Sequence, residues 1–257
     1  MCADARIGGE YFGLGCEALC PYRKRHLSGP TTKVALLPNL FRRQSVDAVL
    51  RWGGFAQLER TVMDEFFKPR AHPYLGVVPQ SKLDWMALAQ HHGCPTRLLD
   101  WTGNPLVGLF FASENDDDCD GVLWAITHFH WFPANTGDDV LESIEKLNKA
   151  FIYAPKHITA RITAQDAAFT VHSFAADSSG SPVPLQSASD LESRIFRPSV
   201  PDAPAGVVAH TVIPGACKER IQRELHILNI HREALFPGLD GLSDHIKQVL
   251  EGWFGPC

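Results

Sequence analysis

Residues Gln90 to Ala112 read QHHGCPTRLLDWTGNPLVGLFFA, a stretch that combines turn-forming residues, polar side chains and a strongly apolar run. Gly93 and Pro95 are expected to end a preceding helix, because glycine tolerates a positive φ and proline cannot continue a helix. Polar and apolar residues then alternate over Thr96–Thr102, which predicts a short strand or a tight ordered loop. The stretch therefore predicts a helix, a turn and a strand in close succession.

A second helix is predicted directly after this strand. Asn104 followed by Pro105 is typical of a helix N-cap and a first helical position. Residues 106–111 are apolar almost all round, so this helix should be buried. Arg97 and Asp100 stand just before it, and charged side chains beside a buried helix need either mutual pairing or a bound ligand.

Two interpretations of this charged pair stay open. In the first, Arg97 and Asp100 pair with each other and with backbone groups, and they form a structural clamp. In the second, the loop is one wall of a binding cleft, because rigid polar loops held between buried elements commonly carry binding sites. The polar contacts of that cleft would be His91, His92, Thr96 and Thr102.

The composition is that of a globular protein with an apolar core. The chain has 257 residues, of which 45% are hydrophobic and 21% charged, and its formal net charge is −5. This charge gives no general attraction for nucleic acid or for an acidic membrane, although it is compatible with a local basic patch. No apolar run predicts a transmembrane helix and no signal peptide is recognised, so we expect a cytoplasmic protein without a membrane partner.

The cysteines indicate neither a disulfide framework nor a metal site. Seven cysteines are an odd number at irregular spacing, which favours reduced thiols. Cys16 and Cys20 lie close together, but no second pair of cysteines or histidines follows nearby at ligand spacing. We therefore predict no metal site.

The order of the expected elements indicates an α+β fold. Helices are expected over 46–66, 83–93, 140–151 and 216–230, with a last helix capped by Ser243, and strands over 34–41, 121–127, 161–171 and 207–213. Helices and strands do not alternate regularly, which favours a compact core of mixed or antiparallel sheet flanked by helices. We expect an N-terminal extension over 1–20 and a single domain over 21–257, with a flexible Ser- and Pro-rich segment at about 177–205.

The stretch from Gln90 to Thr102, with Ala112 closing the apolar helix, resembles the hallmark of the FRG-domain family. Other segments agree with the family in their order along the chain, so that the resemblance extends over roughly residues 20–245. These segments are Tyr22-Arg23, Leu36–Arg42, Arg161–Phe169 and Leu235–Leu242. The chain departs from the family pattern at one position, where Lys24 replaces the glycine after the N-terminal arginine.

The order of these segments also resembles the layout of ADP-ribosyltransferases of the Arg–Ser–Glu type. That resemblance implies that Arg23 contacts the pyrophosphate of NAD, that Thr102 stands at the Ser or Thr position, and that Gln165 lies near the position of the acid. A glutamine cannot ionise, so Asp100 or Glu224 would supply the charge that assists ribosyl transfer. The cofactor implied by this layout is NAD.

No familiar catalytic motif decides the function, and two hypotheses stay open. In the first, the chain is a nucleotide- or NAD-dependent transferase or hydrolase with Asp100, Gln165 and Glu224 as catalytic residues. The binding residues of its cleft would be Arg23, His91, His92, Thr96, Arg97, Trp101 and Thr102. In the second, the chain is a non-catalytic module that binds nucleic acid or a protein through the basic cluster at residues 23–26.

Overall fold

The structure is a computed structural model, and it describes residues 38–42, 49, 51–76, 78–114, 120–126, 131–132, 141–142, 144–145, 150–155, 159–174 and 208–250. The predicted N-terminal extension, the basic cluster with Arg23, and the Ser- and Pro-rich segment at 177–205 lie outside these residues. Among the described residues, no helix is long and apolar enough to cross a membrane.

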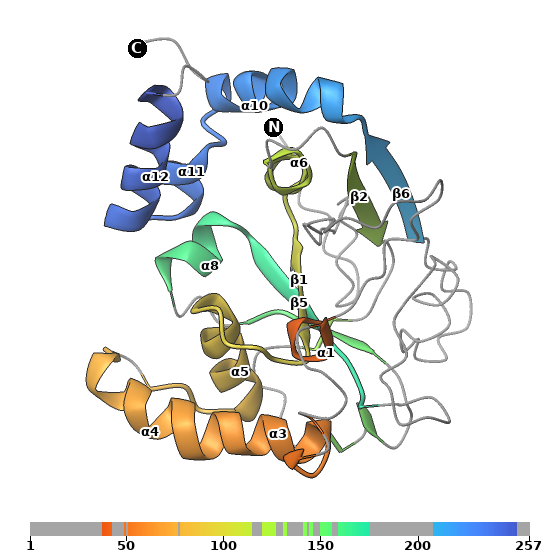
Figure 1. Cartoon of the computed structure of the whole chain (residues 1–257), viewed down its shortest axis with the longest axis vertical. Helices are drawn as coiled ribbons and strands as arrows, with labels where there is room; N and C mark the ends of the chain where they lie inside the picture. Colours follow the sequence, from red (N-terminus) through yellow and green to blue (C-terminus); the bar gives the residue numbers. More distant parts are fainter. Residues whose placement is uncertain are drawn as a thin grey trace, which may run out of the picture.

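Helices and strands follow one another without a regular alternation. The helical segments are α1 (Asn39–Arg42), α3 (Phe55–Arg60), the π-helix η1 (Thr61–Phe67), α4 (Lys68–Ala71), the 3-10 helix η2 (His72–Tyr74), α5 (Lys82–His91), α6 (Pro105–Ser113), α8 (Ala160–Ala164), the 3-10 helix η3 (Gly215–Cys217), α10 (Lys218–Ile227), α11 (Arg232–Leu235) and α12 (Leu239–Leu250). The strands are β1 (Leu98–Thr102), β2 (Gly121–Ile126), β3 (Trp131–Phe132), β4 (Phe151–Tyr153), β5 (Ala167–Val171) and β6 (Val208–Ile213). In Figure 1, α10 to α12 lie at one end of the molecule and α3 and α4 at the opposite end, with β1 and β5 between them.

The strands form two separate sheets, which confirms the α+β prediction. The larger sheet has the order β1-β5-β4-β3, with antiparallel pairing except between β3 and β4, which run parallel. The smaller sheet pairs β2 with β6 in an antiparallel ribbon. The sequence predicted a buried central strand at β2. Among the described strands, β2 pairs only with β6, and Val122 and Leu123 are half-buried.

The stretch from Gln90 to Ala112 folds largely as predicted. Helix α5 ends at His91, and Gly93 follows with a φ of 80°. Strand β1 buries every residue except Asp100. Leu98 joins the main core, which includes Leu83 and Tyr153. The two elements therefore pack into one apolar layer and leave a single charged side chain of β1 exposed.

Helix α6 is built from the predicted cap. The Asn104 side chain accepts a hydrogen bond from the Leu106 backbone N–H over 2.9 Å, and Pro105 occupies the first turn. Val107 and Phe110 are each 1% exposed and pack with Leu225 of α10. The apolar helix thus joins the central sheet to the C-terminal helices.

Two segments differ from the predicted secondary structure. The strand expected over 161–171 is a helix–turn–strand unit: α8 begins after Thr159, whose side chain accepts from the Ile162 N–H, and ends at Gln165. Asp166 then takes a φ of 45° before β5. Residues 39–42, expected in a strand, form the short helix α1. Local capping at Thr159 outweighs the alternating pattern that suggested a longer strand.

The C-terminal helices also differ from the prediction. Helix α12 begins at Leu239 rather than after Ser243, and Ile246 and Leu250, expected inside, are 48% and 80% exposed. The apolar spacing over 216–230 predicts Leu228 on the inner face of the helix and Lys218 on the outer face. In the structure, Leu228 lies beyond the end of α10 and is 58% exposed, whereas Lys218 is buried. Periodicity identifies the helices but not the side that tertiary packing covers.

The Asn104 cap gives a testable consequence for stability. We expect Asn104→Ala to lower the free energy of unfolding by about 1 kcal/mol, because the Leu106 N–H loses its acceptor. Asn104→Asp should keep most of the stability, since a carboxylate accepts the same bond. Chemical denaturation of the three proteins measures the difference, and an Ala variant as stable as the parent would contradict the cap's contribution.

Candidate functional site

The side chains of Gln90, Thr96 and Asp100 form a hydrogen-bond network between α5 and β1. The Gln90 side chain donates through Nε2 to Asp100 Oδ2 over 2.8 Å and accepts at Oε1 from Thr96 Oγ1 over 2.8 Å. Thr96 Oγ1 in turn accepts from the Leu98 N–H over 3.1 Å. Thr96 is completely buried, so its hydroxyl serves the chain itself and is closed to a ligand.

Arg97 is buried in an internal ion-pair network. Its Nε lies 3.0 Å from Glu59 Oε2, its Nη1 pairs with Glu145, and its guanidinium lies 4.1 Å from the centre of the Phe174 ring. Burial raises the pKa of Glu59, and the neighbouring Arg97 charge opposes that rise. Arg97 therefore does not pair with Asp100 as the clamp interpretation expected, and it is not available to a ligand.

The Arg97 network predicts a large loss of stability on truncation. We expect Arg97→Met to lower the free energy of unfolding by about 3–5 kcal/mol, because it leaves the buried Glu59 without its compensating charge. Adding Glu59→Gln to that variant should restore part of the loss. Chemical denaturation measures both, with the exposed Arg220→Met as a control expected to stay within about 0.5 kcal/mol of the parent. A loss below about 1 kcal/mol for Arg97→Met would contradict the role.

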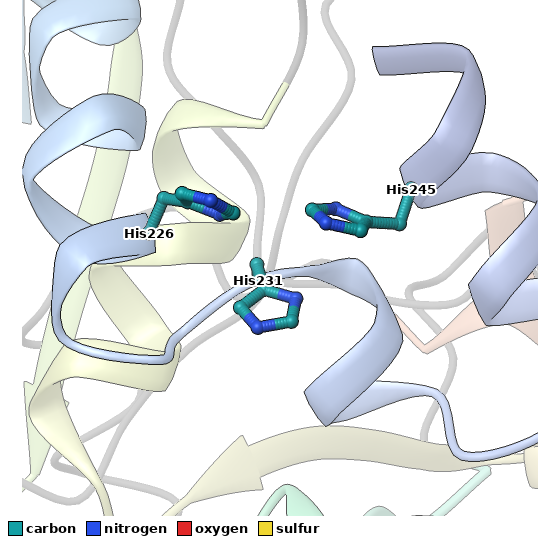
Figure 2. Close-up of side chains that lie close together, drawn as sticks. All are labelled: His226, His231 and His245. Carbon is teal, nitrogen blue, oxygen red and sulfur yellow. The ribbon is translucent and has the colours of Figure 1, made fainter. Parts of the chain in front are cut away.

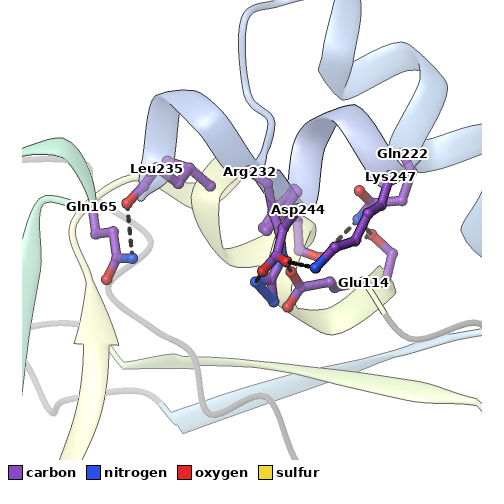
Figure 3. A network of polar contacts seen from close by, with 9 residues as sticks. Glu114, Gln165, Gln222, Arg232, Leu235, Asp244 and Lys247 are labelled. Carbon is purple, nitrogen blue, oxygen red and sulfur yellow. Dashed lines mark hydrogen bonds and ion pairs between the residues drawn. The ribbon is translucent and has the colours of Figure 1, made fainter. Parts of the chain in front are cut away.

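Thr102 and Gln165 do meet, and they act as a link between elements. Thr102 Oγ1 donates to the Gln165 backbone carbonyl over 2.6 Å and accepts from the Asn104 N–H over 3.1 Å. The Gln165 side chain donates through Nε2 to the Leu235 carbonyl over 3.0 Å (Figure 3). Gln165 ends α8 and is not in a strand, so the prediction that placed it mid-strand was wrong.

The remaining predicted residues divide between the interior, the surface and the undescribed part of the chain. Trp101 is 5% exposed and donates from Nε1 to Thr170 Oγ1 over 2.8 Å, so it is a core residue. Glu224 lies on the exposed side of α10 and pairs with Arg220 over 2.8 Å. Arg23 lies outside the described residues.

Among the described residues, two members of the predicted set turn toward different elements. Arg97 precedes β1 and Thr102 ends it. At about 3.3 Å per residue the two lie roughly 16 Å apart along the strand. Arg97 turns to Glu59 of α3, while Thr102 turns to the end of α8. A different surface includes the exposed Asp100 of β1 and the half-buried His91 at the end of α5.

Arg161 also lies at this surface, although the sequence did not predict it as a binding or catalytic residue. Its guanidinium is half-buried, lies 4.3 Å from the centre of the Phe236 ring, and donates from Nη1 to the His91 carbonyl over 3.2 Å. Its Nε is buried and has no hydrogen-bond partner, and no carboxylate within the described ranges forms an ion pair with it. Burial lowers the pKa of Arg161, and the Asp100 charge opposes that change. Arg161 does belong to the segment Arg161–Phe169 that resembles the family, but that resemblance assigns no function to it.

A second arginine lies over the same aromatic ring from α11. The Arg232 guanidinium is 4.8 Å from the centre of the Phe236 ring and forms ion pairs with Glu114 over 2.7 Å and Asp244 over 3.0 Å. Figure 3 shows this network joining the end of α6 to α11 and α12. Burial raises the pKa of Glu114, against the effect of Arg232. Arg232 is therefore committed to two carboxylates, whereas Arg161 is not.

His91 is held neutral beside Arg161. Burial, together with the charges of Arg161 and His92, lowers the pKa of His91 from 6.5 to about 4. His91 and His92 also meet edge to face, with ring centres 4.7 Å apart. At neutral pH, His91 therefore adds no positive charge to this surface and can serve as a hydrogen-bond donor or acceptor.

The lowered pKa of His91 predicts a pH dependence of stability. As the pH falls below 6.5 toward 4, the unfolded chain takes up a proton before the folded one does, so the free energy of unfolding falls with pH in that window. Because the ring is half-buried, we expect a loss of about 1 kcal/mol after solvent screening. In His91→Gln this part of the loss should disappear.

Denaturation at pH 7 and pH 4.5 measures this difference. The exposed His72→Gln is the matched control and should keep the parent's pH dependence. A His91→Gln variant that loses as much stability on acidification as the parent would refute the assignment.

The comparisons with known proteins agree with this description of the motif. Residues 29–121 match the family model described as the FRG domain, which supports the family resemblance of the sequence motif. No curated protein and no solved structure matches the chain. The likeness to ADP-ribosyltransferases stays a prediction.

Proposed function

We propose that this FRG-domain protein binds a phosphate-bearing nucleotide, with NAD as the first candidate, at the surface around Arg161, and that it acts as a transferase or hydrolase. The observation that carries the proposal is the half-buried Arg161 guanidinium, whose buried Nε has no hydrogen-bond partner. A guanidinium matches phosphate through parallel hydrogen bonds. The cost of holding this charge away from water is explained if an anion binds there.

The groups around Arg161 support a nucleotide over a simple inorganic anion. The Phe236 ring packs against the guanidinium groups of both Arg161 and Arg232, so it holds the Arg161 side chain in place. His91 is neutral and half-buried, and an uncharged imidazole can hydrogen-bond a ribose hydroxyl or a base edge. These groups come from α5, α8 and the segment after α11, so the site would be formed by elements that the fold brings together.

Asp100 is the carboxylate that we assign to the chemical step. It is the exposed residue of β1 and accepts a hydrogen bond from Gln90, which fixes its position. Its charge reaches Arg161. Glu224 is paired on an exposed helix face and Gln165 cannot ionise, so neither supplies a charge at this surface. A fixed carboxylate can stabilise the positive charge that develops at a ribosyl carbon or can activate water.

The binding proposal predicts a thermal shift. At a concentration about one hundred times Kd, a ligand adds about 2.7 kcal/mol to the free energy of unfolding, which should raise Tm by roughly 5 °C or more. We expect this shift with NAD or ADP and not with adenosine, because adenosine lacks the phosphates. Arg161→Gln should abolish it and Arg161→Lys should weaken it. Arg220→Gln, which removes an exposed arginine on α10, should leave it unchanged.

Two further measurements separate binding from catalysis and from the alternative binding module. Asp100→Asn keeps an oxygen for Gln90 and should retain the thermal shift while it lowers turnover of the bound nucleotide at least a hundredfold, measured by product analysis. Nucleotides that give no shift up to millimolar concentration would reject the proposal. Salt-sensitive binding of single-stranded RNA that is unchanged in Arg161→Gln would instead support a nucleic-acid module.

A further inference from the structure

Three histidines from three separate elements meet in the C-terminal helical unit. His226 lies in the last turn of α10, His231 directly before α11, and His245 on α12. One ring nitrogen of each lies within 4.8 Å of the corresponding nitrogens of the other two, and all three side chains are half-buried. Figure 2 shows the rings of His226 and His245 facing each other, with His231 between and below them.

We propose that His226, His231 and His245 bind a divalent transition-metal ion, with Zn²⁺ as the first candidate, and leave one coordination position open to solvent. Three imidazoles are a ligand set that suits Zn²⁺, Ni²⁺ or Cu²⁺ and does not suit Mg²⁺ or Ca²⁺, which prefer oxygen ligands. The inference does not depend on the nucleotide site.

The spacing of the rings is close to that of a metal centre. The ring centres lie 5.0, 5.2 and 4.6 Å apart, and three imidazoles bound tetrahedrally to zinc have centres roughly 5 Å apart, given Zn–N bonds of about 2.0–2.1 Å. The ring nitrogens would close by roughly 1 Å to reach coordination distance. Small rotations of half-buried side chains provide such a movement without a change in the backbone.

The backbone that positions these rings is tightly fixed. Helix α10 ends in a Schellman motif, in which the Ile230 N–H bonds to the Leu225 carbonyl and the Asn229 N–H to the His226 carbonyl, each over 2.9 Å. Asn229 takes the left-handed conformation with a φ of 61°, as the C′ position of this motif requires. The chain therefore reverses between His226 and His231 and turns their rings toward the same space.

Helix α12 is held against this turn by two contacts. Asp244 pairs with Arg232 of α11 over 3.0 Å. A Cβ at Gly241 would overlap the Phe236 carbonyl oxygen, so glycine permits the close approach of α12 to the end of α11. These contacts place His245 opposite the reversal, and the three ligands do not depend on a flexible side chain reaching across solvent.

One histidine also has the outer hydrogen bond that metal-binding imidazoles typically make. His231 Nε2 lies 3.0 Å from Asn229 Oδ1. A carboxamide oxygen only accepts, so Nε2 donates and Nδ1 carries the lone pair. His231 Nδ1 is buried and has no hydrogen-bond partner. A partner on one nitrogen that fixes the tautomer and directs the other at a metal is the usual outer-shell arrangement.

The test uses the full chain after chelator treatment and dialysis, with Zn²⁺ and Co²⁺ as probes. We expect isothermal titration calorimetry to show one saturable site. Co²⁺ should give d–d absorption without the charge-transfer band of a thiolate, because the proposed ligands are three histidines and none of the described cysteines lies among them. His231→Gln and His245→Gln should each weaken Zn²⁺ binding more than about tenfold. His72→Gln, at an exposed histidine outside the cluster, should bind as the parent does.

A further variant keeps the fold while it removes the outer hydrogen bond. Asn229→Gly retains a residue that readily adopts a positive φ, and should weaken Zn²⁺ binding about tenfold with circular dichroism unchanged. Should a histidine variant fail to fold, His226→Gln and Asn229→Gly decide in its place. No saturable binding by the parent chain, or equal affinity in the cluster variants and the His72 control, would overturn the proposal.

Discussion

The burial of one positive charge at the start of β1 constrains the rest of the structure. Arg97 is 6% exposed, and a guanidinium in such a position must be neutralised by carboxylates on the same chain. Glu59 and Glu145 supply them from segments far apart in the sequence. These ion pairs hold the start of β1 next to α3, and the hydrogen-bond network around Gln90 holds the same strand next to α5. The position of β1 is thus determined by charge and by apolar packing together.

Most of the polar residues in the family motif are used in folding. Thr96, Arg97, Trp101 and Thr102 each bind a partner inside the chain, which explains why these polar side chains lie next to an apolar helix. Asp100 also accepts a hydrogen bond from Gln90, but it is the residue of β1 whose side chain is exposed. The motif therefore builds a rigid strand and presents one carboxylate at the surface, while the adjoining arginine comes from α8.

The sequence predicts many helices and strands of this fold correctly, but it does not predict which distant residues they contact. The cap at Asn104, the end of α5 and the buried helix α6 all follow from local chemistry, so they could be predicted. Gln165 could not be placed correctly, because the cap at Thr159 and the turn at Asp166 replace the first part of an apparently alternating strand. The ion pairs of Arg97 join residues 38 and 48 positions away, and no local pattern indicates such partners.

The histidine cluster is a second feature that the sequence alone does not predict. His226 and His231 are five residues apart, a spacing that brings them together only because the helix ends between them in a left-handed residue. His245 joins them through the packing of α12, which depends on Gly241. A search for ligand pairs three or four residues apart on one helix does not find these three histidines. Tertiary structure is needed to recognise it.

The short segment from His231 to Phe236 connects the two proposed sites. It begins with a histidine of the cluster, continues through the arginine that pairs with Glu114 and Asp244, and ends with the Leu235 carbonyl bound by Gln165 and the ring beside Arg161. A metal ion on the three histidines would fix the start of this segment, and fixing it would restrain the ring at its end. The two proposed sites therefore share one short segment, and its contacts with Gln165, Glu114 and Asp244 hold that segment in place.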